Sequence, residues 1–325
     1  MSDNTSDDEQ QQQMQEISIC ADVWLEVFAF VSPVELGHLM ALISDRFDVL
    51  VDEHFKTRKW SLREMEIFRA FDGNGAQIVN FSRGLPDRQP IPQGPIPNKV
   101  IGFEGINIRY IDGSVIEFLQ RIGRLFNSSE TTVAICTSED QSRSWDIIRQ
   151  KIWPLINDNI CSFLLDISSL DRLRQFSPTV PHSTKLRSMD FFGNFYDNVN
   201  ASSAQAVANW LLTPREDGRP KICHVGGMEK QLKEAFVNAS SEPANFIISI
   251  WDDRLVPFEL TNNLTRERLT LRQMDDDYGW LLVRCPIVRE EDKWTNWEKE
   301  AIKWEWRPQW NSIVITFQDS DIGDG

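Results

Sequence analysis

The chain has 325 residues and a formal net charge of -15, and this length suggests two domains, or one repeat domain with an appendage. Nucleic acid and anionic membranes are excluded as expected partners, because both are bound through concentrated basic surface. With 41% hydrophobic residues most of the chain is expected to fold, and no stretch approaches the roughly 18 consecutive apolar residues of a membrane-spanning helix.

Residues 1–16 form an acidic, Gln-rich stretch, MSDNTSDDEQQQQMQE, which we predict to be disordered. It lacks the basic start and apolar run of a secretory signal, so a cytoplasmic or nuclear location is expected. The five cysteines are widely spaced and form no C-x-x-C pair, which favours reduced thiols over a disulfide framework or a zinc cluster.

Residues 17–62 are predicted to form three short helices. The first spans DVWLEVFAFV, which carries apolar residues on two faces, and Ser32-Pro33 begins a second helix with an apolar stripe from Leu36 to Ile43. The third is expected from about Arg46 to Arg58. So small a unit buries a low fraction of its surface, and a surplus apolar face indicates a binding partner.

The same segment resembles an F-box, whose pattern opens with Leu-Pro-x-Glu/Asp-Leu/Val. The matching stretches, in order, are Ile19-Cys20-Ala21-Asp22-Val23, Val27-Phe28, Val31, Pro33-Val34-Glu35-Leu36 and Leu42-Ile43-Ser44-Asp45-Arg46-Phe47. Cys20 replaces the usual proline, which in the family lies at the adaptor contact. The wider context, including VIGFE and IRYIDGSVIEFLQRI, is similar to a lineage-expanded group of nematode F-box proteins. An ordinary helical core is the alternative interpretation of the segment.

The resemblance implies a non-catalytic, substrate-recruiting adaptor. Its expected partners are the small adaptor subunit and the cullin of a cullin–RING ubiquitin ligase, together with an unknown protein substrate. The alternative is an F-box scaffold acting outside the ligase. The residues expected to contact the adaptor are Ile19, Cys20, Val23, Leu36, Leu39 and Ile43. Trp24 and Phe28 are expected to lie inside the unit.

Residues 63–98 are predicted to be a linker, because the stretch 84–98 contains five prolines that favour an extended spacer. Deletion of residues 1–84 is therefore expected to leave a folded fragment.

Residues 99–325 show a strand-then-helix rhythm, which predicts an α/β domain with a parallel sheet. The expected strands are 106–111, 132–136, 161–167, 186–192, 221–225 and 246–251. Ser114, Ser138 and Ser202 are predicted helix caps. The stretch Leu186–Asn194 fits the leucine-rich-repeat signature L-x-x-L-x-L-x-x-N, so we interpret the domain as a degenerate leucine-rich-repeat-like array. The C-terminal part departs from this rhythm. It is predicted to be a strand-rich cap with strands 257–260, 268–271, 280–284 and 312–317 and a helix over 289–306.

Alternation along a strand predicts which side chains face solvent. In the unit that fits the signature, Leu186, Met189 and Phe191 are expected in the core. Arg187, Ser188, Asp190 and Phe192 are expected to face outward, with Asn107, Arg109, Asp166 and His224 at equivalent positions of nearby strands. This open sheet face is the predicted substrate surface, with Arg109, Arg187 and Phe192 as contacts; a merely solvated face is the alternative. The tryptophans of residues 289–306 are predicted to pack on the last sheet, and a binding face there is the second choice.

The chain shows no motif typical of an enzyme, and no catalytic residue, cofactor or metal is expected. His224 precedes Gly226-Gly227, which suggests an oxyanion loop, but no nucleophile motif accompanies it and a structural role is favoured. The run Asp275–Asp277 is interpreted as a solvated turn rather than a cation site.

Overall fold

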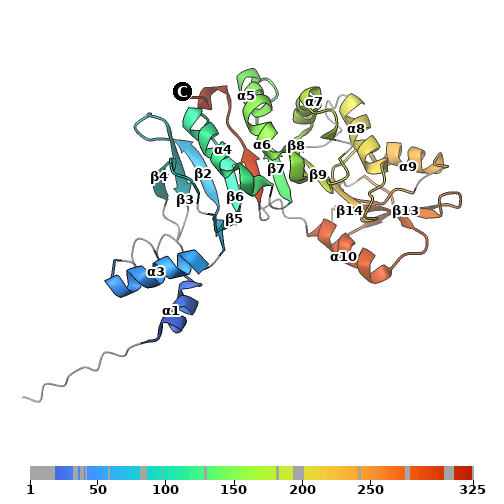
Figure 1. The fold of residues 1–325 in the computed structure, drawn as a ribbon. Coiled ribbons are helices and arrows are strands. Elements are labelled where there is room, and N and C mark those ends of the chain that lie inside the picture. Colours follow the sequence, from blue (N-terminus) through green and yellow to red (C-terminus); the bar gives the residue numbers. More distant parts are fainter. Residues whose placement is uncertain are drawn as a thin grey trace, which may run out of the picture. The chain divides into compact units, whose positions relative to one another are not determined.

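The computed structural model describes residues 19–323 apart from 32–35, 37–39, 41, 58, 81–85, 97, 128–129, 181–182, 193–200, 241–242, 253, 275–278 and 304–310. The chain divides into two compact units, Met1–Trp60 and Ser61–Gly325 (Figure 1). The predicted disorder of residues 1–16 lies outside the described residues.

The first unit contains the helices α1 (Ala21–Phe28) and α3 (Asp45–Thr57). Most of the second predicted helix lies outside the described residues. The core consists of Phe28, Leu36 and Val51, with Trp24 and Phe47 among the partly buried side chains around it. The Trp24 and Phe47 rings meet edge to face at 4.7 Å. The expectation that Phe28 lies inside this unit is thus confirmed, whereas Trp24 is partly buried against the core.

The second unit is built on a mixed sheet, to which the described residues contribute 13 strands in the order β12-β13-β14-β11-β10-β9-β8-β7-β15-β6-β2-β3-β4. The run from β11 to β2 is parallel, and antiparallel strands extend it at both ends. The strands are β2 (Met65–Arg69), β3 (Ala76–Asn80), β4 (Asp87–Pro90), β6 (Gly105–Ile108), β7 (Thr131–Ile135), β8 (Ile160–Asp166), β9 (Ser188–Phe192), β10 (Lys221–His224), β11 (Phe246–Trp251), β12 (Phe258–Asn262), β13 (Glu267–Gln273), β14 (Gly279–Pro286) and β15 (Ser312–Ile315). A separate two-stranded sheet is formed by β1 (Trp60–Leu62) and β5 (Val100–Phe103).

Helices cover both faces of the large sheet. Most lie on one face, whereas α10 (Glu291–Ile302) lies on the other (Figure 1). The first group contains α4 (Gly113–Phe126), α5 (Ser142–Ile147), α6 (Trp153–Ile156), α7 (Ile167–Phe176), α8 (Ala201–Leu212) and α9 (Glu229–Val237), with a π-helical segment Ile148–Ile152 and a 3-10 turn Asn157–Asn159. Trp294 and Ala301 of α10 are buried against Ile247 and Leu281. The prediction that this helix packs on the last strands is confirmed for Trp294 and Trp297, while Trp304 lies outside the described residues.

The α/β class is confirmed, and the six strands predicted between residues 106 and 251 are all present within a few residues. The linker prediction for residues 63–98 is wrong, because β2, β3 and β4 belong to the large sheet. Deletion of residues 1–84 would remove two of these strands, so a folded fragment is instead expected to begin at Ser61.

The last strand also lies elsewhere than predicted. β15 does not join the antiparallel strands β12 to β14 but runs between β6 and β7. The succession expected of a repeat array therefore holds from β7 to β11 only. Asn194 of the repeat signature lies outside the described residues.

Two of the helix starts are fixed by aspartates rather than by the predicted serines. The Asp112 side chain accepts the Val115 N–H of α4 at 3.0 Å, and the Ser114 hydroxyl donates to that same carboxylate. At α5 the Ser144 N–H donates to Asp319 at 2.8 Å. Asp319 follows β15, so the C-terminal segment caps a helix that begins far earlier in the chain.

Candidate functional site

An apolar row lies on the outside of the first unit. Val23 is 47% and Val27 41% exposed on α1, Ile19 just before the helix is 37% exposed, and Phe30 just after it is 92% exposed. Val23 and Val27 are spaced by four residues, which places them on one side of α1, and Ile19 precedes the helix. Leu42 and Ile43 are exposed as well. Val49 of α3 is also 67% exposed, so the described residues of this unit leave seven large apolar side chains in contact with solvent.

The predicted adaptor contacts differ in their exposure to solvent. Ile19, Cys20, Val23 and Ile43 are exposed. Leu36 is wrong as a contact, because it is fully buried in the core with Phe28 and Val51. Leu39 lies outside the described residues. Val27 and Phe30 were not predicted as adaptor contacts, although the spacing of Val27 from Val23 places both on one face of a helix.

The predicted substrate face is wrong at β9 and β10, because α10 covers it. Ser188 and Asp190 are buried, and the imidazole of His224 bonds Asp190 through Nδ1 and the Ala301 carbonyl of α10 through Nε2, the latter at 2.8 Å. Arg187 donates to Glu300 of α10 at 2.6 Å. These side chains hold a helix in place and do not face an open surface.

The two other predicted contacts differ in their surroundings. Arg109 donates to Glu66 of β2 at 2.6 Å, so it belongs to an ion pair between neighbouring strands. Phe192 is 43% exposed at the end of β9. The structure therefore does not bring Arg109, Arg187 and Phe192 together at one open site.

His224 lies in a row with Asp190 and Ser249 on three neighbouring strands, which is a Ser-His-Asp order. Both imidazole nitrogens face oxygen acceptors, so each carries a proton in this arrangement and the ring cannot act as a general base. Burial lowers the pKa of His224, but the hydrogen bond and charge of Asp190 and the Ala301 carbonyl outweigh it, and the pKa is raised. The arrangement supports a structural cation at the C-terminal end of α10.

We expect this cation to make stability pH-dependent. The folded-state pKa of His224 lies above its unfolded value of about 6.5. Its stabilisation is thus complete below about pH 6.5 and is lost as the pH rises through the folded-state pKa. In urea unfolding at a series of pH values, the wild-type free energy of unfolding should fall relative to that of His224→Asn as the pH rises.

The comparison with the variant isolates His224 from other titrating groups. Burial and the Arg215 charge lower the pKa of Lys221 to about 7, so Lys221 changes stability in the opposite sense. Lys221 is present in both proteins and its contribution cancels in the difference. If the difference in free energy of unfolding between the wild type and His224→Asn stays constant from pH 5 to 9, His224 is not the titrating group.

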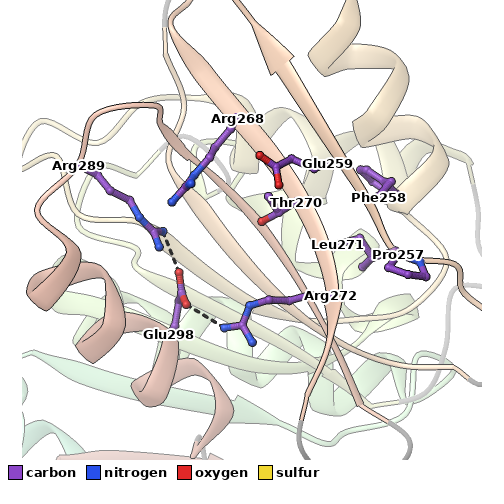
Figure 2. A pocket seen from close by; sticks show the side chains of 9 residues that line it. All are labelled: Pro257, Phe258, Glu259, Arg268, Thr270, Leu271, Arg272, Arg289 and Glu298. Carbon is purple, nitrogen blue, oxygen red and sulfur yellow. Dashed lines mark hydrogen bonds and ion pairs between the residues drawn. The ribbon is translucent and has the colours of Figure 1, made fainter.

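An open pocket of about 450 Å³ lies on the α10 side of β12 and β13 (Figure 2). Its lining residues are Pro257, Phe258, Glu259, Arg268, Thr270, Leu271, Arg272, Arg289 and Glu298. Glu298 of α10 accepts from Arg289 at 2.8 Å and from Arg272 at 2.9 Å. Arg268, Thr270 and Arg272 alternate along β13, and this spacing in the sequence already places two arginines on one face of a strand.

The charges of this pocket are held in pairs. Burial lowers the pKa of Arg289, but hydrogen bonds to Glu291 and Glu298 outweigh it, so its pKa lies above the usual range. Arg268 lies 3.3 Å from Glu291. The pocket therefore presents cations fixed in direction by carboxylates, suited to contact with polar or acidic protein surface.

Searches against protein-family models, curated protein sequences and solved structures find no match to this chain. Among the described residues, no helix combines the length and hydropathy needed to cross a membrane, and no three His, Cys, Asp or Glu side chains are grouped as metal ligands. Asp275–Asp277 lies outside the described residues.

Proposed function

We propose that residues 17–62 act as an F-box-like module that docks on the small adaptor subunit of a cullin–RING ubiquitin ligase. The second unit, including the repeat-like run from β7 to β11, then recruits a protein substrate. The observation that carries this proposal is the exposure of Ile19, Val23, Val27 and Phe30 on a unit that also has a buried core of Phe28, Leu36 and Val51. Exposed apolar side chains gathered on one side of a small unit mark a protein-binding surface.

The proposed role is that of an adaptor without chemistry of its own. Binding of substrate next to the ubiquitin-loaded ligase raises its effective concentration at the site of transfer. The fold supplies a suitable carrier, since the large sheet is covered by helices on both faces and the charged pocket beside β13 lies on the second unit.

The proposal is tested by replacing exposed members of the row. Val23→Asp with Val27→Asp should weaken binding of the purified adaptor by about 100-fold or more, because two carboxylates would be buried without partners. Calorimetric titration of the full chain with adaptor, and pull-down of the cullin, measure the loss. Leu36 is unsuitable for this test, since a charge there would disrupt the core of the unit.

Glu26→Ala is the matched control, because Glu26 is an exposed polar residue of the same helix. This variant should bind the adaptor as the wild type does. If the double variant keeps its helical circular dichroism and binds adaptor normally, the proposed surface is wrong. Adaptor binding without co-purifying cullin would instead favour a scaffold acting outside the ligase.

A further inference from the structure

The arginines of the pocket beside β13 outnumber the carboxylates that pair with them. Arg268 and Arg289 both pair with Glu291 of α10. Arg289 and Arg272 both pair with Glu298 of the same helix. The ion pairs thus form a chain in which three guanidiniums alternate with two carboxylates. In the part of the protein that the structure describes, this chain begins and ends on a cation, and one positive charge is left over.

Glu259 is the remaining carboxylate that lines the pocket. It lies on β12, opposite Thr270 in the strand register, and it is exposed. Among the described residues it forms no ion pair with any of the three arginines. Its charge therefore weakens the attraction of the pocket for an anion from the rim, but it does not occupy a guanidinium.

Arg272 is the cation of the chain that solvent reaches best. Its side chain is 48% exposed, whereas that of Arg289 at the centre of the chain is 10% exposed. Its Nη2 donates to Glu298 at 2.9 Å, which fixes the direction of the guanidinium. A guanidinium carries five N–H donors, so Arg272 can bind a second acceptor at the same time. Thr270 lines the pocket two residues earlier, on the same face of β13, and adds a hydroxyl (Figure 2).

We propose that this pocket binds the carboxylate of an acidic side chain of a recruited protein, with Arg272 and Thr270 as donors. This inference rests on the proposed role of the second unit in recruiting a protein. A guanidinium binds a carboxylate through two parallel N–H groups, and the ligand supplies the negative charge that the chain of ion pairs lacks. Pro257 and Leu271 line the same pocket and offer apolar contact to the stem of the acidic side chain.

The charge of the whole protein makes this site distinguishable from unspecific attraction. The formal net charge is -15, so an acidic peptide is repelled by the molecule as a whole. Binding of such a peptide must then come from a local group of cations. The pocket is open and has a volume of about 450 Å³, which gives a segment of protein chain access to Arg272.

Calorimetric titration of the full chain with a blocked peptide of four glutamates measures this binding. The same peptide with four glutamines is the reference. At low salt we expect a dissociation constant of roughly 0.1 to 1 mM for the glutamate peptide, at least about tenfold tighter than for the glutamine peptide.

Two variants of the pocket should change this affinity in opposite directions. Arg272→Gln should weaken binding of the glutamate peptide at least about fivefold, because it removes the main donor. Glu259→Gln should strengthen it about twofold or more, because it removes the negative charge at the rim. Arg149→Gln is the matched control, since Arg149 is 51% exposed and pairs with the single carboxylate of Asp146 outside the pocket. It should bind the peptide as the wild type does.

The proposal is overturned if the glutamate peptide binds no better than the glutamine peptide, or if Arg272→Gln and Arg149→Gln cause the same loss. Inorganic phosphate that binds at least about tenfold tighter than the glutamate peptide would assign the pocket to phosphate groups instead. The variant Val23→Asp with Val27→Asp should keep its peptide affinity. Failure of adaptor binding and failure of this pocket are therefore seen in separate measurements.

Discussion

Replacement of Ile313 by Asp should unfold the second unit. Ile313 is 1% exposed at the centre of β15, where its register partners are Ile106 of β6 and Val133 of β7. A carboxylate there has no partner, and its burial is expected to cost about 4 kcal/mol or more, a large part of the total stability of a typical domain. Circular dichroism and urea unfolding should show loss of the sheet or a large decrease of the urea midpoint.

Ile313→Val is the matched control, because it removes one methylene group and keeps the strand apolar. It should cost only about 1 kcal/mol. Deletion from Asn311 onward should be as severe as the aspartate, since it removes β15 together with the Asp319 cap of α5. An Ile313→Asp variant that unfolds like the wild type would show that β15 does not pair between β6 and β7.

Replacement of Glu267 by Ala should cost about 3 to 5 kcal/mol. The Arg284 and Glu267 side chains are 1% and 0% exposed, and they lie 2.6 Å apart on neighbouring strands. Glu267 also accepts the Ala244 N–H at 2.8 Å. The alanine variant would leave both the guanidinium and this N–H buried without an acceptor, and the free energy of unfolding measured in urea should fall accordingly.

The double variant Glu267→Ala with Arg284→Met shows whether the cost comes from the unpaired Arg284 charge or from the loss of the Glu267 contacts. It removes both charges, so it should cost less than Glu267→Ala alone, although two side chains are changed. Equal destabilisation by the single and the double variant would mean that the unpaired guanidinium is not the cause.

The positions of the strands followed from local sequence, but their neighbours did not. Runs such as Phe246–Trp251 are apolar on both faces, which is typical of a parallel strand covered on both sides, and β11 has these same bounds. Nothing within residues 312–317 says which two strands flank them. The linker prediction, which rested on the proline-rich stretch, was wrong for a related reason. Prolines are tolerated at an edge strand, and Pro90 ends the edge strand β4.

The predictions of site residues were wrong where an element far away in the sequence covers the predicted surface. Alternation placed Asp190 and His224 on one side of the sheet, and they do share a side, but α10 lies on it and receives the His224 hydrogen bond. Likewise Leu36 was predicted as a contact from the apolar stripe of the second predicted helix, and such a stripe marks the core of a small helical unit equally well. Only the solvent exposure of a side chain distinguishes a binding residue from a core residue, and this exposure depends on residues far away in the chain.

The place of β15 has a consequence for how the protein is made. Ser312 of β15 donates to Glu104, which precedes it by 208 positions. During synthesis from the N-terminus, β6 and β7 leave the ribosome long before the strand that separates them, and the gap between them stays open meanwhile. Contacts of such long range slow folding, and unpaired strand edges invite misassociation. The sheet is therefore expected to close only after residue 315 has been translated, when β15 can pair with both β6 and β7.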